Sequence, residues 1–227
     1  IATGSLPGAM EVVGADKAAA LGPGDLDRLE AAPSRLAVLG SDGEACFWAQ
    51  QLRRLGSEVH LIAVESRLLE DMDRQAAGIV VEQLQAEGVR VHAGCDEVRL
   101  DRTGYRRGVQ FRQNGQRGKL LVDEVLVCAS PRPNLGGLAL ETAGVRYGRR
   151  GIAVDDRLGT SDRHVYAAGG ACGADLASPE AELGTGRLAA RNAAAWLPRR
   201  LATCVIPRYT PTDPPVVELR THASRKA

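Results

Sequence analysis

A strand, a helix and a second strand joined by very short connections constrain this sequence more than any other feature. Residues 36–39 form the apolar run Leu-Ala-Val-Leu and end in Gly40, which is typical of a buried parallel strand. Apolar residues recur at helical spacing over 44–55, and Gly56 predicts the end of that helix. Residues 59–62 form the next apolar run. Because a short strand–helix–strand unit crosses over in one hand, we expect both strands to be parallel neighbours in one sheet.

The chain continues with another helix and strand before its apolar period changes. Residues 72–87 predict a helix and residues 89–92 a third strand. A period of two then predicts a three-stranded meander within residues 98–122, with a hairpin turn at Asn114-Gly115. Residues 125–128 form a further apolar run. The expected fold class is therefore α/β, with a Rossmann-like parallel sheet and a three-stranded antiparallel meander.

The remaining third of the chain predicts shorter elements. Residues 1–4 are typical of a strand end that runs into a turn, and residues 152–154 and 165–168 predict strands. A helix is expected from about residue 180 to 196. From residue 204 onward the sequence is rich in proline, which predicts extended backbone.

Composition excludes several classes of partner. The 227 residues carry a net charge of +1 and only 4% aromatic residues, so we expect neither nucleic acid nor an anionic membrane surface as partner. No apolar run reaches the length of a membrane span. With 44% hydrophobic residues, the chain is expected to build a globular core.

The cysteines and histidines do not form a metal-ligand or disulfide pattern. Five cysteines stand at wide and irregular spacings, at Cys46, Cys95, Cys128, Cys172 and Cys204. This odd count without a C-x-x-C pair predicts free thiols in a reducing compartment, the cytoplasm, rather than disulfides. His60 and His92 fall on predicted strands and are interpreted as ordinary strand residues. We therefore expect no metal site.

The turn after the first strand carries part of a dinucleotide-binding pattern. It reads Gly40-Ser41-Asp42-Gly43-Glu44-Ala45, against the pattern G-x-G-x-x-G or G-x-G-x-x-A. In that pattern the first glycine makes the tight turn, the second lets the backbone approach the pyrophosphate, and the third small residue lets the helix pack on the strand. Gly40 and Ala45 suit the first and third roles, but Asp42 stands at the second.

Asp42 leaves two interpretations of this turn open. A helix N-terminus attracts anions, but a carboxylate at ~4 Å from a phosphate charge, with an effective dielectric of about 20, adds repulsion on the order of 4 kcal/mol. Asp42 could instead cap the helix, a position that suits aspartate. The turn then serves either as a binding site for a dinucleotide or as a scaffold without one.

The end of the second strand raises a similar question. An acidic residue there normally accepts hydrogen bonds from the ribose of NAD, and an arginine nearby favours NADP. This chain has Ala63 and then Val64 at the strand end, and neither side chain can do this. Glu65 and Arg67 follow closely, so a shifted contact to the nucleotide is the alternative.

Several segments resemble, in order, the pyridine nucleotide–disulfide oxidoreductases, the family of mercuric reductase and dihydrolipoamide dehydrogenase. Residues 1–5 read Ile-Ala-Thr-Gly-Ser, which is similar to a strand end beside FAD in that family. Residues 165–169 read Val-Tyr-Ala-Ala-Gly, which resembles the strand that returns to the FAD domain. The other similar segments are 35–69, 123–130, 138–145, 151–155 and 207–217.

The resemblance implies a domain organisation. It places the Rossmann-like sheet and its meander between pieces of a second, FAD-type domain. Residues 1–33 would be the end of that domain and a connector, and residues 34–129 the NAD(P)-binding domain. Residues 130–200 would return to the FAD-type domain, and 201–227 would begin a truncated dimerisation domain.

The resemblance also implies a function and its cofactors. The chain would be the central portion of an oxidoreductase that passes a hydride from NAD(P)H to FAD and on to a disulfide, thiol or metal substrate. Small-molecule or thiol substrates are implied, and a homodimer where the C-terminal domain is complete. The residues implied to meet the NAD(P) pyrophosphate are Gly40, Ser41, Gly43 and Glu44. Those implied to lie along FAD are Thr3, Gly4, Gly169 and Gly170.

Departures from the family pattern support a second hypothesis. Gly170 stands where the family has an aspartate for the FAD ribitol, and losing a charged hydrogen bond costs about 1.5–3 kcal/mol. Ser130 replaces a glycine, and Phe47 replaces a glutamate of the nucleotide helix. The redox cysteine pair and the C-terminal histidine are not in this sequence, so we assign no catalytic residue and expect this chain alone to be inactive. Together with Asp42 and Ala63, these departures favour a non-catalytic paralogue or fragment that keeps the fold as a scaffold.

Overall fold

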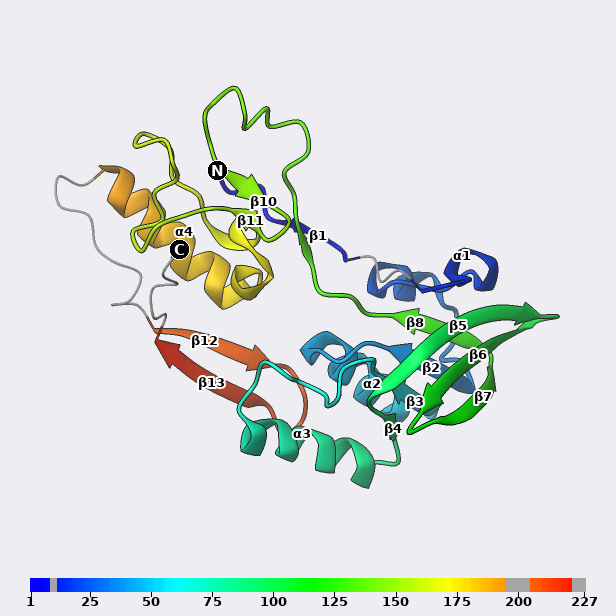
Figure 1. Ribbon diagram of the computed structural model, residues 1–227. Coiled ribbons are helices and arrows are strands. Elements are labelled where there is room, and N and C mark those ends of the chain that lie inside the picture. The colour runs from blue at the N-terminus through cyan, green and yellow to red at the C-terminus, as the bar shows by residue number, and fades with distance from the viewer. Residues whose placement is uncertain (9–11, 195–204, 222–227) are drawn as a thin grey trace. The chain divides into compact units, whose positions relative to one another are not determined.

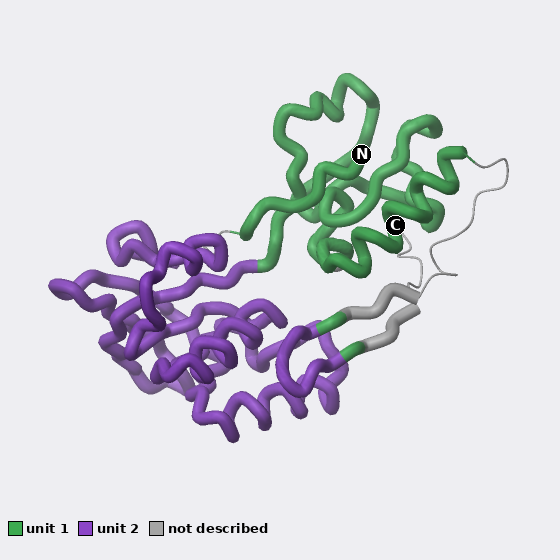
Figure 2. Tube along the Cα trace, turned by 180° about the vertical axis from the view of Figure 1, so that it is seen from behind, with its two compact units in different colours: residues 1–8, 130–209, 217–227 green, residues 9–129, 210–216 purple. Residues whose placement is uncertain are grey.

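The structure is a computed structural model that describes residues 1–8, 12–194 and 205–221. By its internal contacts the chain divides into two compact units, coloured separately in Figure 2. The first unit comprises residues 1–8, 130–209 and 217–227. The second unit comprises residues 9–129 and 210–216.

A four-stranded parallel sheet forms the middle of the second unit (Figure 1). Its strands lie in the order β4 (Arg90–His92), β3 (Glu58–Ile62), β2 (Arg35–Leu39) and β8 (Glu124–Val127). Every neighbouring pair is parallel, and Leu36 of β2 lies opposite Val59 of β3. The helices α2 (Gly43–Arg54) and α3 (Arg74–Ala86) connect β2 to β3 and β3 to β4. The parallel strand–helix–strand unit predicted from the sequence is confirmed.

Both faces of this sheet are covered, which explains why its strands are continuously apolar. Leu36 and Val38 point to the core shared with α2 and α3, where Leu84 is also buried. Ala37 and Leu39 alternate with them and belong to a second core. That second core lies against the antiparallel meander.

The meander has three strands, β5 (Cys95–Thr103), β6 (Arg106–Gln113) and β7 (Gln116–Val122). Asn114 and Gly115 form the turn between β6 and β7 with φ of 52° and 78°, as expected for a two-residue hairpin with positive φ at both positions. Val109 and Phe111 of β6 belong to the second core, together with Ala37 and Leu39 of β2. The predicted meander and its turn are confirmed, although its strands are longer than the apolar residues alone indicated.

A connector precedes β2 and lies beside β8. It contains the short helix α1 (Ala15–Ala18) and the 3-10 helix η1 (Pro23–Arg28). The Leu21 amide donates to the Val125 carbonyl at 2.8 Å, and the Val127 amide donates to the Leu21 carbonyl at 2.8 Å. One residue of the connector therefore pairs with the outer edge of the parallel sheet.

The first unit is built from short pieces around two small cores. Its strands pair antiparallel, β1 (Ser5–Leu6) with β9 (Arg132–Pro133) and β10 (Tyr147–Gly148) with β11 (Gly151–Ile152). Its helical elements are the 3-10 helices η2 (Gly169–Cys172) and η3 (Ala174–Leu176) and the helix α4 (Pro179–Ala194). The helix predicted over 180–196 is present as α4, and residues 195–196 lie outside the described residues.

Of three strand predictions in this unit, two were wrong and one was correct only in part. Residues 1–4 form no strand, because Gly4 has a φ of +70° that interrupts the extended backbone before β1. The strand predicted at 152–154 ends at Ile152. Residues 165–168 form no strand, because their backbone bonds are divided between the loop near Leu158 and the N-terminal Ile1.

The C-terminal segment returns to the second unit as the turn of a hairpin. Strands β12 (Val205–Thr210) and β13 (Val216–Thr221) pair with each other, which agrees with the extended backbone predicted there. The buried Gln50 side chain holds the turn, since its amide nitrogen donates to the Asp213 carbonyl and its oxygen accepts from the Asp213 amide, both at 2.8 Å. Val216 completes the core beside α2 and α3.

Two imidazoles are paired between β3 and β4. His60 Nδ1 lies 3.0 Å from His92 Nε2, and the rings stack with centroids 5.3 Å apart. Arg90 Nη1 lies 3.3 Å from His60 Nε2, and a guanidinium can only donate a hydrogen bond. We therefore infer that Nε2 of His60 accepts from Arg90, and that His60 carries its proton on Nδ1 and donates it to His92. Burial lowers the pKa of both rings, and for His60 the charges of His92 and Arg90 lower it further.

This pair predicts a loss of stability in mild acid. Both pKa values are lowered in the folded chain, so the unfolded chain binds protons first as the pH falls below about 6.5. The free energy of unfolding, measured with urea from pH 7.5 to 5, should therefore decrease as the pH falls. In the double variant His60→Gln, His92→Gln the decrease should be smaller, whereas His164→Gln, at an exposed site, should keep it. Equal slopes in the double variant and the parent chain would contradict the interpretation.

Candidate functional site

The turn between β2 and α2 brings three backbone segments into close contact. Gly40 has a φ of +149°, and a Cβ there would lie 2.6 Å from the Cys128 carbonyl oxygen and 2.9 Å from the Ala45 Cβ. A side chain at residue 40 would therefore collide with the backbone that follows β8, and one larger than alanine at residue 45 would crowd the same contact. The sequence pattern anticipated glycine and a small residue at these two positions for this reason.

Asp42 caps the helix α2. Its backbone is extended, and its Oδ1 accepts a hydrogen bond from the Ala45 amide at 3.0 Å. The capping alternative considered for Asp42 is thus the one that the structure adopts. One of the amide hydrogens that a bound phosphate would need already has an acceptor within the chain.

A second carboxylate lies next to the cap. Burial raises the pKa of Glu44, and the negative charge of Asp42 raises it further. The same two causes raise the pKa of the Cys46 thiol to about 12. Asp42 therefore places a negative charge at the amino end of α2, which opposes the attraction of the helix N-terminus for anions.

The hairpin turn from the far end of the sequence lies against this site. A Cβ on Gly43 would be 3.5 Å from the Thr210 Cγ2 and 3.6 Å from its Oγ1. Thr210 is itself buried. In the same turn, the backbone carbonyl of Ser41 accepts a hydrogen bond from the Leu69 amide at 2.7 Å. Sequence reasoning missed Thr210, because no local pattern indicates that residue 210 returns to the turn at residue 43.

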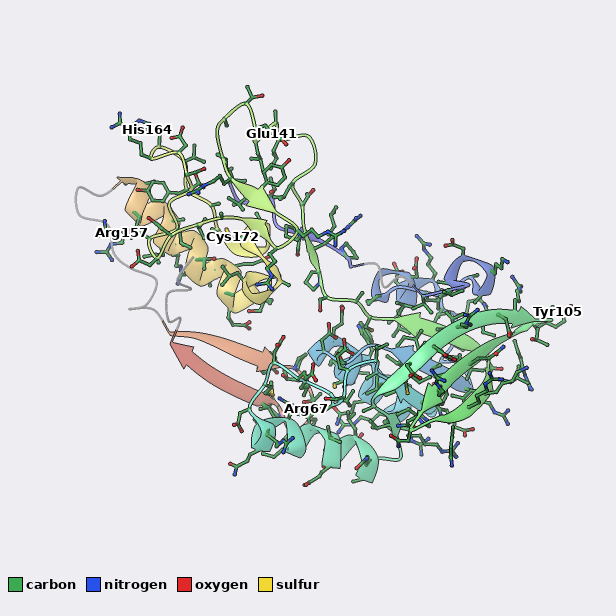
Figure 3. All side chains as sticks on the ribbon, in the orientation of Figure 1. Arg67, Tyr105, Glu141, Arg157, His164 and Cys172 are labelled. Atoms are coloured by element: carbon green, nitrogen blue, oxygen red, sulfur yellow. The ribbon has the colours of Figure 1, made fainter. Side chains whose placement is uncertain are left out.

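Glu65 and Arg67, which follow β3, are the two residues that could contact the ribose of a nucleotide. The structure leaves only Glu65 available for that contact. Ala63 is fully buried and has only a methyl group. Arg67, labelled in Figure 3, donates to the carbonyls of Leu69, Glu70 and Met72, so its guanidinium holds the loop before α3. By contrast, Glu65 Oε2 is buried and has no hydrogen-bond partner among the described residues. Glu65 is therefore the better candidate to accept a ribose hydroxyl.

The positions expected along FAD come together within the first unit. The Thr3 hydroxyl donates to the Asn134 carbonyl at 2.7 Å, and the Asn134 amide donates to the Gly4 carbonyl at 3.0 Å. A Cβ on Gly170 would lie 2.9 Å from the Ser5 Cβ, so the start of an aspartate side chain at residue 170 would overlap Ser5.

The neighbouring backbone of this unit is positioned by a buried threonine. Gly169 has a φ of +66°, and its amide donates to the Thr185 hydroxyl at 3.0 Å. Ser130 is exposed and directly follows the segment after β8. Phe47 makes an edge contact with Trp48, where a carboxylate was expected.

Of the four cysteines among the described residues, Cys46, Cys95 and Cys128 are buried and Cys172 is half-buried. Burial raises the pKa of Cys95 and of Cys172 to about 11 and that of Cys128 higher still. None is therefore a thiolate near neutral pH. Within residues 1–8, 12–194 and 205–221, no group of three or more histidine, cysteine, aspartate or glutamate side chains is arranged to hold a metal ion.

A dinucleotide fits part of this site only. Gly40 and Ala45 provide the tight turn, and Glu65 has a buried oxygen that needs a donor. Asp42 caps α2 at the end where the pyrophosphate of a dinucleotide lies in this type of fold, and Glu44 follows it in the first turn. The α2 N-terminus therefore meets a pyrophosphate with one amide already capped and with a like charge, which predicts weak binding. Among the positions expected along FAD, Gly170 has no side-chain acceptor, and Ser5 leaves no room for one.

The sheet, the meander and the glycine turn define a dinucleotide-binding type of fold, and comparisons identify the family. The family model described as pyridine nucleotide-disulphide oxidoreductase matches residues 1–195. The chain belongs to this family.

Curated relatives and solved structures agree with that assignment. Mercuric reductase of Staphylococcus aureus is 30% identical over 221 residues, which are 95% of this chain and 40% of that protein. Dihydrolipoyl dehydrogenase of Bacillus subtilis is 35% identical over 174 residues, 76% of this chain and 37% of that protein. This chain thus spans about two fifths of the length of these relatives.

Two solved structures share the fold. LpdA of Mycobacterium tuberculosis superimposes with a TM-score of 0.78 at 26% identity, over 95% of this chain and 46% of that chain. The HOCl-induced flavoprotein disulfide reductase RclA of Escherichia coli gives a TM-score of 0.82 at 22% identity, over 96% and 49%. Within the described residues, no helix is long and apolar enough to cross a membrane.

The cap on α2 predicts a measurable contribution to stability. Asp42→Ala should lower the free energy of unfolding in urea by about 1 kcal/mol, because the Ala45 amide loses its acceptor. Asp42→Ser keeps a side-chain oxygen at the same position and should lose less than half of that amount. Equal losses in the two variants, or no loss in either, would show that the cap does not stabilise the helix.

Proposed function

We propose that this chain is the central portion of an FAD-dependent oxidoreductase that uses NAD(P)H and delivers electrons to a disulfide, thiol or metal substrate. Membership of the family supports the class of reaction. The observation that carries the proposal is the tight turn at Gly40, which approaches the Cys128 carbonyl and Ala45 as the dinucleotide-binding pattern requires.

In this proposal the two cofactors belong to different units. The nucleotide contacts are Gly40, Ser41, Gly43 and Glu44 at the start of α2, with Glu65 in place of Ala63 as the acceptor for the ribose. The flavin contacts are Thr3, Gly4, Gly169 and Gly170, with Ser130 beside them in the sequence pattern. When bound, the cofactors supply the redox chemistry, and this part of the protein positions them.

A second candidate function follows from the cap. With Asp42 bound to the Ala45 amide and Glu44 beside it, the chain is a scaffold that keeps the fold and has lost nucleotide affinity. Gly170, without an acceptor for the flavin, favours the same interpretation. The two candidates differ in whether removing one charge restores nucleotide binding.

The homodimer and the small-molecule or thiol substrate are proposals that rest on the family.

Nucleotide binding separates the two candidates. We expect NADH and NADPH to bind the chain weakly in a calorimetric titration, and NADH to bind the Asp42→Ser variant at least about tenfold more tightly. The reason is the loss of a like charge that would lie about 4 Å from a phosphate, a repulsion on the order of 4 kcal/mol at a dielectric of about 20 before salt screening. Asp27→Ser, which removes an exposed carboxylate of η1, is the matched control and should not change the affinity.

The possible outcomes are distinct. Tighter binding by Asp42→Ser alone supports a nucleotide site and identifies the residue that weakens it. No binding by any variant contradicts the oxidoreductase proposal for this chain and supports the scaffold. Visible flavin absorbance in the purified chain would contradict the scaffold, whatever the nucleotide result.

Glu65 supplies a further prediction for the same site. In the Asp42→Ser background, Glu65→Gln should weaken NADH binding by about fivefold to tenfold, because a charged acceptor for the ribose hydroxyls is replaced by a neutral one. The matched control is Glu82→Gln on the exposed surface of α3, which should leave the affinity unchanged. Equal affinity in the Glu65→Gln variant would remove Glu65 from the site.

A further inference from the structure

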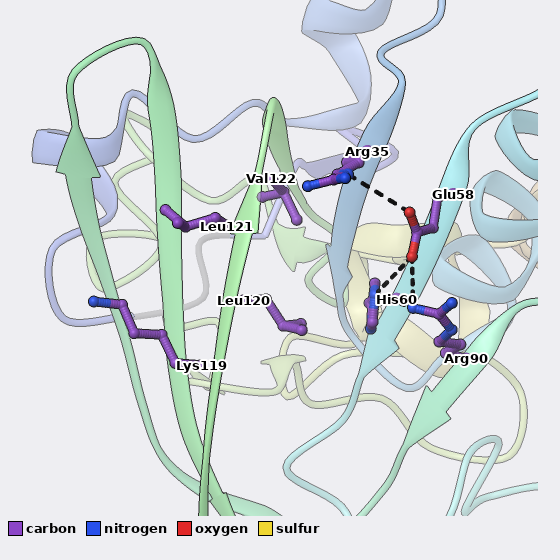
Figure 4. A pocket seen from close by; sticks show the side chains of 8 residues that line it. All are labelled: Arg35, Glu58, His60, Arg90, Lys119, Leu120, Leu121 and Val122. Carbon is purple, nitrogen blue, oxygen red and sulfur yellow. Dashed lines mark hydrogen bonds and ion pairs between the residues drawn. The ribbon is translucent and has the colours of Figure 1, made fainter.

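A cavity of about 290 Å³ lies at the amino ends of the parallel strands, away from the glycine turn. Figure 4 shows it between the starts of β2, β3 and β4 and the edge strand β7. Gly40 follows the carboxyl end of β2, whereas Arg35 begins that strand at the cavity. The cavity is therefore separate from the proposed nucleotide site and is contained within the second unit.

One wall of the cavity has an excess of positive charge. Glu58 receives two guanidiniums, with Arg90 Nη1 at 2.5 Å from its Oε1 and Arg35 Nε at 3.6 Å from its Oε2. These ion pairs engage one nitrogen of each guanidinium, and a guanidinium has five N–H donors. His60 is also in this wall, and burial lowers its pKa, which favours the neutral ring. Two positive charges thus meet one negative charge in this wall.

The opposite wall is apolar. Leu120 and Val122 of β7 extend toward the parallel sheet in Figure 4, and Val122 is almost fully buried. Leu121, which also lines the cavity, is 40% exposed. Charged donors on one side and aliphatic groups on the other are the usual features of a site for a small molecule with a polar end and an apolar end.

We propose that this cavity binds a small organic acid. Its carboxylate would lie between the guanidiniums of Arg35 and Arg90, which match a carboxylate in a planar, two-pronged geometry. Its short aliphatic body would lie against Leu120, which is half-buried in the lining. The Glu58 carboxylate already pairs with both guanidiniums, so the carboxylate of the ligand competes with it for them. This inference is independent of the proposed oxidoreductase function, because the two sites share no residue.

The experiment is an NMR titration of the whole chain with butyrate, following the backbone amides of Glu58, Leu120 and Val122. Butyrate should shift these amides in a saturable way. Arg90→Gln should weaken binding by about tenfold and Glu58→Gln should strengthen it by about tenfold, since one removes a donor and the other removes the competing acceptor. Arg117→Gln, on the same strand but outside the cavity lining, is the matched control for charge and should leave binding unchanged.

Other probes identify the class of ligand. Butylamine, which has the same aliphatic body and the opposite charge, should not bind. Inorganic phosphate should bind at least about fivefold more weakly than butyrate, because it gains nothing from the apolar wall. The proposal is overturned if butyrate gives no saturable shift, if phosphate binds as well as butyrate, or if Arg117→Gln has the same effect as Arg90→Gln.

Discussion

The amide hydrogens at the start of α2 need acceptors, and the identity of those acceptors controls what this fold can bind. In this chain Asp42 supplies one by accepting from Ala45 at 3.0 Å. A helix whose first turn is capped by its own carboxylate is stable without a ligand. The same carboxylate repels the phosphates that this type of turn otherwise receives. In the proposed function, this one hydrogen bond therefore links the stability of the helix to its affinity for a nucleotide.

The geometry around this bond is set by packing that leaves little freedom. The parallel sheet is covered on both faces, so β2 and β8 are fixed side by side. Gly40 must then approach the Cys128 carbonyl without a side chain, and Ala45 must stay small. Thr210, held in place by the Gln50 contact to Asp213, closes the turn from the other side. The tight turn of the dinucleotide-binding pattern is thus formed, and a carboxylate stands at its centre.

Sequence reasoning predicted the parts of the fold that depend on local pattern. Continuous apolar runs identified the parallel strands, and the turn at Asn114-Gly115 identified the meander, because these signals reside in a few neighbouring residues. The strand expected at 165–168 failed because its partners, the Leu158 loop and Ile1, are far apart in sequence and share the bonds between them. The contact of Thr210 with Gly43 was missed for the same reason. Local pattern identified Asp42 as the residue on which the two interpretations of the turn depend, and only the structure showed that it caps the helix.

The most direct test of the account follows individual amides during a nucleotide titration. In a ¹H–¹⁵N NMR titration of the chain with NADH, the account predicts that the Ala45 amide keeps its resonance position, because Asp42 already occupies it. Replacing Asp42 by glycine, which removes both the charge and the capping oxygen, should make the amides of Gly43 and Ala45 shift on addition of NADH. A saturable shift of the Ala45 amide in the unaltered chain, with the affinity unchanged by the glycine, would contradict the account.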